Sequence, residues 1–320
     1  MLPRLPRRAA RPRRRPDRAA AGRSVRARRG AALGGLALLI LGGVMAPARA
    51  QKGDRPPPGY VQLGKPDQEE GRAVLEQFRR QGIAGDYYLE FALRVLPRHG
   101  AERAWHGRMW GTRNADGPIS RVSLRPPGDK PQTEVRLLVR SGPEPAVWRW
   151  NEGSGGAAEL LGVAAQFAPV ADNDLTPFDL QMPFLYWPSF AYEGLARMRG
   201  RPSHQFLFRP PAEVAAQYPA LTGVRAYLDT QYTALVQVTL IGQGDRPLKT
   251  LSILDLKKIS DQWIVESIDL RDEFTRNKTR FEVTAAALNQ TFAATVFDPA
   301  QLAEPAVAPA GEGLVVINPP

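Results

Sequence analysis

A long series of short segments in which apolar and polar residues alternate constrains the fold of this chain more than any other sequence feature. In the first, Tyr87, Leu89, Phe91, Leu93 and Val95 alternate with more polar neighbours, and a period of two is typical of a half-buried strand. Further strand segments are predicted at 105–110, 119–124, 133–139, 146–150, 192–199, 204–209, 223–229, 234–241, 249–256, 263–270 and 279–284. Turn signals separate them roughly every ten to fifteen residues, which predicts a mainly β, antiparallel barrel or sandwich.

Helical signals are few. Asp67 is a predicted N-cap with Glu70 three residues later, and Val74, Leu75 and Phe78 follow at helical spacing. Residues 153–190 are rich in Gly, Ala and Pro and then aromatic, which predicts short helices or a lid-like loop. Long helices do not alternate with strands, which argues against a parallel α/β fold.

The N-terminus has the three parts of an export signal: a basic start, an apolar run at 31–45 and small residues before a cut after Ala50. The apolar run is shorter than the roughly 20 residues that span a bilayer. An uncleaved anchor remains the alternative, and Arg28 with Arg29 leaves twin-arginine export open beside the general route. The domain prediction is a signal peptide at 1–50, a Pro-rich leader at 51–65, a folded domain at 66–304 and a disordered tail at 305–320. We therefore expect a periplasmic protein.

The positive charge of the chain belongs to this signal. Of the 43 basic and 32 acidic residues, thirteen arginines and one aspartate lie within residues 1–50, so the remainder has a formal net charge of −1. No basic stripe remains to indicate a nucleic-acid partner. The chain has no cysteine, which excludes disulfides, thiolate metal sites and a cysteine nucleophile.

Residues that could carry catalysis do not form a recognisable pattern. His99, His106 and His204 lack metal-ligand spacing, and no nucleophile elbow, phosphate-binding loop or dinucleotide motif occurs. Asp172, Asp174 and Asp179 are interpreted as a solvated acidic loop that caps short helices rather than a calcium site. We expect a non-enzyme without cofactor or metal.

The remaining candidate site is apolar and aromatic. Strand residues with a common face and the aromatic stretch after them could line a cavity for an apolar ligand, although an ordinary filled core is the alternative. The candidate cavity and lid residues are Leu89, Phe91, Leu93, Trp105, Trp148, Trp150, Phe184, Leu185 and Trp187.

A series of short blocks in the second half of the chain occurs in a characteristic order: Asp174–Leu180, Tyr192–Gly194, Arg199–Pro202, His204–Phe208, Val224–Asp229, Leu254–Lys258 and Thr275–Val283. Single motifs carry little weight, but their order and spacing along residues 67–302 together do. In these blocks the chain resembles LolA-like outer-membrane lipoprotein-sorting proteins, in an uncharacterised subgroup.

The resemblance implies an incomplete antiparallel barrel with helices covering its open concave side, an apolar cavity that accepts acyl chains, and no catalytic residues. The arginine that controls the lid of the classical carrier does not map onto Arg94, Arg108 or another residue here. The expected function is a periplasmic acyl-chain or lipoprotein-binding carrier, with residues 153–190 as its lid. The alternative is a regulatory or scaffold protein of the envelope that uses the same fold to bind a protein partner.

Overall fold

The computed structural model describes residues 65–126, 134–153, 156–311 and 313–317. The predicted signal peptide at 1–50 and all but the last residue of the leader at 51–65 lie outside them. Within the described ranges, no helix is long and apolar enough to cross a membrane. The strands are β1 (Asp86–Leu96), β2 (Arg103–Asn114), β3 (Gly117–Arg125), β4 (Val135–Arg140), β5 (Ala146–Asn151), β6 (Glu159–Leu160), β7 (Phe190–Met198), β8 (Arg201–Phe208), β9 (Gly223–Asp229), β10 (Leu235–Ile241), β11 (Pro247–Ile259), β12 (Gln262–Asp272), β13 (Lys278–Gln290) and β14 (Val315–Val316).

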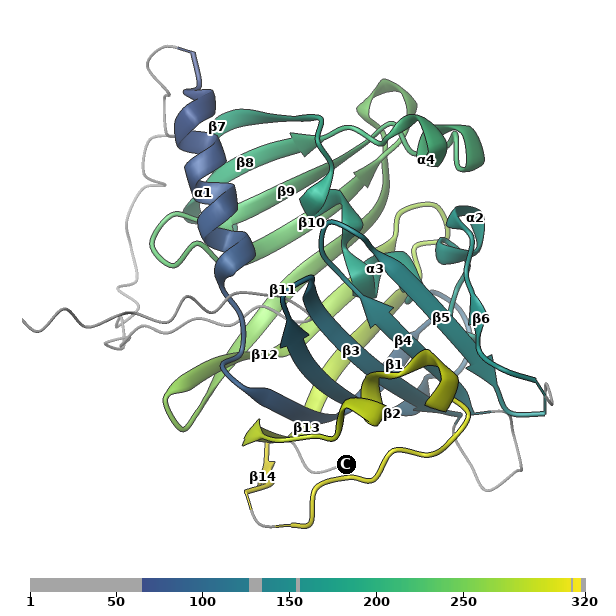
Figure 1. The fold of residues 1–320 in the computed structure, drawn as a ribbon. Helices are drawn as coiled ribbons and strands as arrows, with labels where there is room; N and C mark the ends of the chain where they lie inside the picture. The colour runs from purple at the N-terminus through teal and green to yellow at the C-terminus, as the bar shows by residue number, and fades with distance from the viewer. Residues whose placement is uncertain (1–64, 127–133, 154–155, 312, 318–320) are drawn as a thin grey trace, which may run out of the picture. The chain divides into compact units, whose positions relative to one another are not determined.

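These strands form one sheet in the order β6-β5-β4-β3-β2-β1-β13-β12-β11-β10-β9-β8-β7, and β14 pairs with β13 off this path. The strand pairs are antiparallel, and apart from β1–β13 and the short added strand they join neighbours in sequence. The sheet curves but does not close, because β6 and β7 remain at its two ends (Figure 1). The predicted mainly β, incomplete antiparallel barrel is confirmed.

Helix α1 (Gln68–Arg80) packs on the concave side of the sheet. Asp67 caps it as predicted, since its carboxylate accepts from the backbone N–H groups of Glu69 and Glu70. Gly71 permits the close approach to β7, because a Cβ there would lie 2.4 Å from the Cβ of Tyr192. Gln68 then bonds both the N–H and the C=O of Tyr192, each at 2.9 Å. The helix thereby covers backbone groups of the end strand β7.

Two short helices meet across the open side. Helix α2 (Val163–Gln166) follows β6 at one end of the sheet, and α4 (Ala212–Gln217) follows β8 near the other end. Phe167 comes directly after α2 and stacks on Tyr218, directly after α4, with ring centroids 4.0 Å apart and planes 4° apart. This stack joins the two ends of the unclosed sheet.

The outer, convex face of β13, β1 and β2 has its own small apolar cluster of Tyr88, Trp110 and Ala287. It is covered by the C-terminal segment, which includes the 3₁₀ turns η3 (Ala294–Phe297) and η4 (Pro299–Gln301). Arg121 donates to the carbonyls of Val296, Gln301 and Leu302 at 3.2–3.3 Å. The tail predicted to be disordered also lies here: Trp110 Nε1 bonds the Val307 carbonyl at 3.0 Å, and β14 pairs with β13. This added strand pairs with β13 beyond Glu282, where the pairing of β13 with β12 has stopped.

A buried carboxylate beneath that segment predicts a pH effect on stability. Burial opposes the ionisation of Glu134, but hydrogen bonds from Arg136 and Ser123 outweigh it and lower its pKa to about 2. A lowered pKa stabilises the fold above the ordinary value of 4.5, and this contribution is lost as the pH falls toward 2.

We therefore expect the free energy of unfolding of the wild type to fall more steeply below pH 4.5 than that of Glu134→Gln. Urea unfolding of both proteins at several pH values measures the difference, and Glu144→Gln is the exposed control. Parallel curves for wild type and Glu134→Gln would contradict the assignment.

Candidate functional site

The concave face of the sheet carries one continuous apolar cluster, here called the concave cluster. Three predicted site residues of β1, namely Leu89, Phe91 and Leu93, belong to it and are at most 2% exposed. Trp105 of β2 packs against its border. The alternation read from the sequence places these side chains on one face because successive strand residues point to opposite sides.

The other two strand tryptophans lie on the opposite face. Val147 is fully buried in the concave cluster. Its neighbour Trp148 and, two residues later, Trp150 therefore point outward from β5. There the guanidinium of Arg136 sits 4.4 Å from the Trp150 ring and that of Arg140 sits 5.5 Å from the Trp148 ring. The structure thus separates this pair from the other site residues.

The stretch at 177–189, here called the aromatic insertion, fills the concave side. It contains α3 (Pro177–Gln181), a left-handed residue at Met182 (φ 48°) and the 3₁₀ turn η1 (Pro183–Tyr186). Its side chains Phe178, Phe184, Leu185 and Trp187 are at most 6% exposed. The Phe184 ring lies 6.0 Å from that of Phe178 and 5.6 Å from that of Phe208 on β8. Figure 1 shows α3 on the same side of the curved sheet as α1.

Buried polar groups fasten this insertion at its start. Lys249 of β11 donates to the carbonyl of Asp174 and to the carboxylate of Asp179, and Thr279 of β13 donates to the carboxylate of Asp174 at 2.7 Å. We call Asp174, Asp179, Lys249 and Thr279 the polar latch. Burial raises the pKa of Asp174, against the opposing effects of Thr279 and Lys249. Thr176 and Asp179 cap α3 reciprocally, with the Thr176 N–H and hydroxyl donating at 2.8 and 2.7 Å.

The latch corrects the interpretation of the aspartates as a solvated loop. Asp179 does cap a short helix, but it is 6% exposed and paired with a lysine that is 8% exposed. The signal was present in the sequence: Lys249 shares the inward register of Leu251 on β11, where an unpaired cation is disfavoured. Asp172 lies apart, at the surface beside Arg103.

A second fastening comes from α1. Arg79 Nε donates to the carbonyl of Leu185 at 2.7 Å, and its guanidinium lies 5.1 Å from the Tyr186 ring. The two arginines considered in the sequence lie elsewhere, on the outer face. Arg94 pairs with Glu102 at 2.7 Å, and Arg108 lies 3.9 Å from Glu90.

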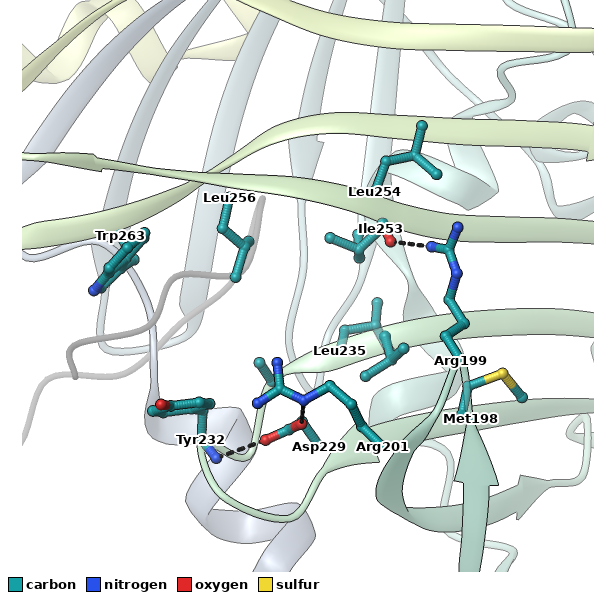
Figure 2. A pocket seen from close by; sticks show the side chains of 12 residues that line it. Met198, Arg199, Arg201, Asp229, Tyr232, Leu235, Ile253, Leu254, Leu256 and Trp263 are labelled. Atoms are coloured by element: carbon teal, nitrogen blue, oxygen red, sulfur yellow. Dashed lines mark hydrogen bonds and ion pairs between the residues drawn. The ribbon is translucent and has the colours of Figure 1, made fainter. Parts of the chain in front are cut away.

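An open crevice leads from the molecular surface toward the concave cluster. It lies where β10 and β11 separate, since their pairing stops at Gln237 and Ser252 while β11 continues to Ile259. Its volume is about 260 Å³, just below the roughly 300–1,000 Å³ typical of ligand pockets. Figure 2 shows Arg199 and Arg201 at one side of it, opposite Leu254 and Leu256 of β11.

The histidines do not assemble a reactive centre. His204 Nδ1 bonds the Tyr192 hydroxyl at 2.8 Å, and burial lowers the pKa of His204. His99 and His106 are exposed. Among the described residues, no group of three or more His, Asp or Glu side chains is arranged to hold a metal ion.

Comparisons with known proteins agree with this architecture. A family model described as an uncharacterized protein matches residues 188–304, less than half of the chain. No curated protein matches the sequence. A solved DUF1329 family protein from Desulfovibrio piger is 14% identical with a TM-score of 0.62, covering 73% of this chain and 98% of its own.

Two further solved structures carry the name expected from the sequence. A putative outer membrane lipoprotein-sorting protein domain from Vibrio parahaemolyticus is 14% identical with a TM-score of 0.62, over 72% of this chain and 97% of its own. A LolA superfamily protein from Nitrosomonas europaea is 12% identical with a TM-score of 0.54, over 71% and 96%. At these identities the likeness is one of fold. The resemblance read from the sequence is confirmed at that level: the described chain has a LolA-like fold, an unclosed antiparallel sheet with helices on its concave side.

Proposed function

We propose that this protein binds acyl chains, free or as the lipid part of a lipoprotein, on the concave face of its sheet in the periplasm. The observation that carries the proposal is an apolar concave face occupied by a separate aromatic insertion that is fastened by polar side chains. The names of the relatives of similar fold, a putative lipoprotein-sorting domain and a LolA superfamily protein, support it. We assign no catalytic residue, in keeping with a binding role.

Displacement of the insertion by a ligand would leave the strand pairing of the sheet intact. Its backbone hydrogen bonds are mostly internal, as between Met182 and Phe178 at 2.9 Å and between Trp187 and Phe184 at 3.2 Å. Its links to β4 are side-chain bonds: Ser141 Oγ donates to the Gln181 carbonyl, and Gln181 Nε2 donates to the Arg140 carbonyl, each at 3.0 Å. An entering chain would replace the aromatic contacts, and each buried methylene contributes about 0.8 kcal/mol.

The test uses the absence of cysteine from the chain. Cysteines at Ser141 and Gln181, which are in contact across β4 and α3, should tie the insertion to the sheet when oxidised. We expect the purified wild type to carry lipid detectable by mass spectrometry and to bind a fluorescent fatty acid. The oxidised pair should lose fatty-acid binding and regain it on reduction.

A matched control places the cysteines at Thr239 and Thr250, which are register partners on β10 and β11. This pair constrains the sheet without touching the insertion, so its oxidation should leave binding unchanged. Failure of the wild type to bind any fatty acid or lipoprotein would overturn the proposal. Equal binding by the locked and reduced Ser141/Gln181 protein would exclude the concave face as the site.

The filled concave side supports a second candidate, a regulatory or scaffold protein of the envelope. The described insertion residues pack as a finished core, as a protein that binds partners through its outer surface would require. In that case the locked variant should retain a stoichiometric partner from envelope extracts while neither form binds acyl probes.

A further inference from the structure

The crevice between β10 and β11 joins an apolar interior to a charged rim. Leu235, 3% exposed, belongs to the concave cluster, and Ile253 and Leu256 pack against that cluster from β11. The walls are therefore continuous with the apolar interior of the protein. Because β10 and β11 do not pair with each other beyond Gln237 and Ser252, the crevice is a gap in the sheet.

The rim is formed by the hairpin between β7 and β8. Arg201 is neutralised, since its Nε lies 3.0 Å from the carboxylate of Asp229. Arg199 is exposed at a left-handed position (φ 50°) and donates through Nη1 to the carbonyl of Ile253. Among the described residues it has no carboxylate partner. One of its five N–H donors is engaged by that bond, so the guanidinium retains both its charge and donors for an anion.

We propose that this crevice receives the end of one acyl chain of a single-chain anionic amphiphile, whose headgroup is bound by Arg199. The inference rests on the proposed acyl binding and adds a second entrance and a headgroup preference to it. The volume of about 260 Å³ fits one chain segment rather than several chains. The apolar walls bury methylenes, and the guanidinium of Arg199, which no described carboxylate neutralises, supplies charge complementarity for a carboxylate or phosphate.

The experiment compares three probes on the purified protein: hexadecanoate, a lysophosphatidate with the same chain, and the neutral methyl ester of hexadecanoate. We expect the wild type to bind both anions more tightly than the ester. Arg199→Gln should weaken the binding of both anions by about fivefold, the size expected for one partly exposed charged contact. The affinity for the ester should stay unchanged. Arg199→Lys should restore most of the anion affinity.

The matched control is Arg209→Gln. Arg209 is also exposed and also donates to a backbone carbonyl, that of Thr222 at 3.1 Å, but lies at the other end of β8. Its replacement should change no affinity. Val236→Phe, which places a larger side chain in the crevice wall, should weaken the binding of all three probes. Its thermal unfolding midpoint should stay close to that of the wild type.

The outcomes separate the inference from the function on which it rests. If no probe binds the wild type, acyl binding itself is wrong. If all probes bind and neither Arg199→Gln nor Val236→Phe changes their affinities, acyl binding stands and the crevice is not its site. The tighter of the two anions in the wild type identifies whether a carboxylate or a phosphate is the preferred headgroup.

Discussion

Replacing Lys249 by methionine is expected to destabilise the protein by about 3–5 kcal/mol, because it leaves a buried carboxylate without its cation. Asp179 is 6% exposed, and Lys249 donates to it and to the carbonyl of Asp174. Thr176 still donates two hydrogen bonds to Asp179, but these do not neutralise its charge. Urea unfolding measures the loss as a lower midpoint with an unchanged slope.

The double variant Lys249→Met with Asp179→Asn tests the cause. Asparagine keeps an acceptor for Thr176 and removes the charge, so the double variant should recover a large part of the lost stability. Arg72→Met is the control, because it breaks an ion pair with Glu69 in which the two side chains are 57% and 80% exposed. It should leave the unfolding midpoint close to that of the wild type. An unfolding midpoint for Lys249→Met equal to that of the wild type would show that the latch does not stabilise the fold.

Hydrogen exchange supplies a second readout for the same variant. If the latch holds the aromatic insertion, the Lys249→Met substitution should accelerate the exchange of amides in α3 and η1. The exchange of amides in β1 and β13, which lie in the middle of the sheet, should increase less. A uniform change over the whole chain would mean that Lys249 supports the sheet as a whole.

The sheet could be predicted from the sequence because period-two alternation records which face of each strand is buried. Buried and less buried residues alternate along most of β1. The start of helix α1 could likewise be predicted from Asp67, which caps it. The predicted end of β13 at residue 284 is too early, because the strand continues to Gln290 through the buried residues Ala285–Ala287, and alanine is a weak strand former.

The arrangement of the candidate site was harder to predict, because it depends on contacts between distant segments. Trp148 and Trp150 share a face, as the sequence indicates, but only the pairing of β5 with β4 shows that this face is the outer one. The latch joins Asp174 and Asp179 to residues 70 to 105 positions away. The crevice exists because β11 extends beyond the last residue that pairs with β10. The local alternation of apolar and polar residues does not give the end of a strand to within a few residues.

Replacing Phe184 by alanine is expected to lower stability by about 3–5 kcal/mol, as for other buried aromatic side chains, and to increase affinity for an acyl probe. The side chain is 1% exposed and lies among Phe178, Trp187 and Phe208. Its removal leaves an apolar space on the concave side, and apolar cavities of this kind stay dry and accept apolar ligands.

The two effects have opposite signs because the insertion and the ligand would compete for the same surface. A weaker insertion is easier to displace, so the free energy lost from folding reappears in part as tighter binding. Tyr88→Ala is the matched control: this ring is fully buried too, but in the outer cluster beside Trp110. It should reduce stability by a similar amount without any gain in probe affinity.

Urea unfolding and titration with a fluorescent fatty acid, performed on the same preparations, measure both effects. A loss of stability in Phe184→Ala with unchanged or weaker probe binding would mean that Phe184 is an ordinary core residue and that cargo does not compete with the insertion. In that event the probe binds elsewhere on the protein, and the surface beneath the insertion is not the acyl-chain site.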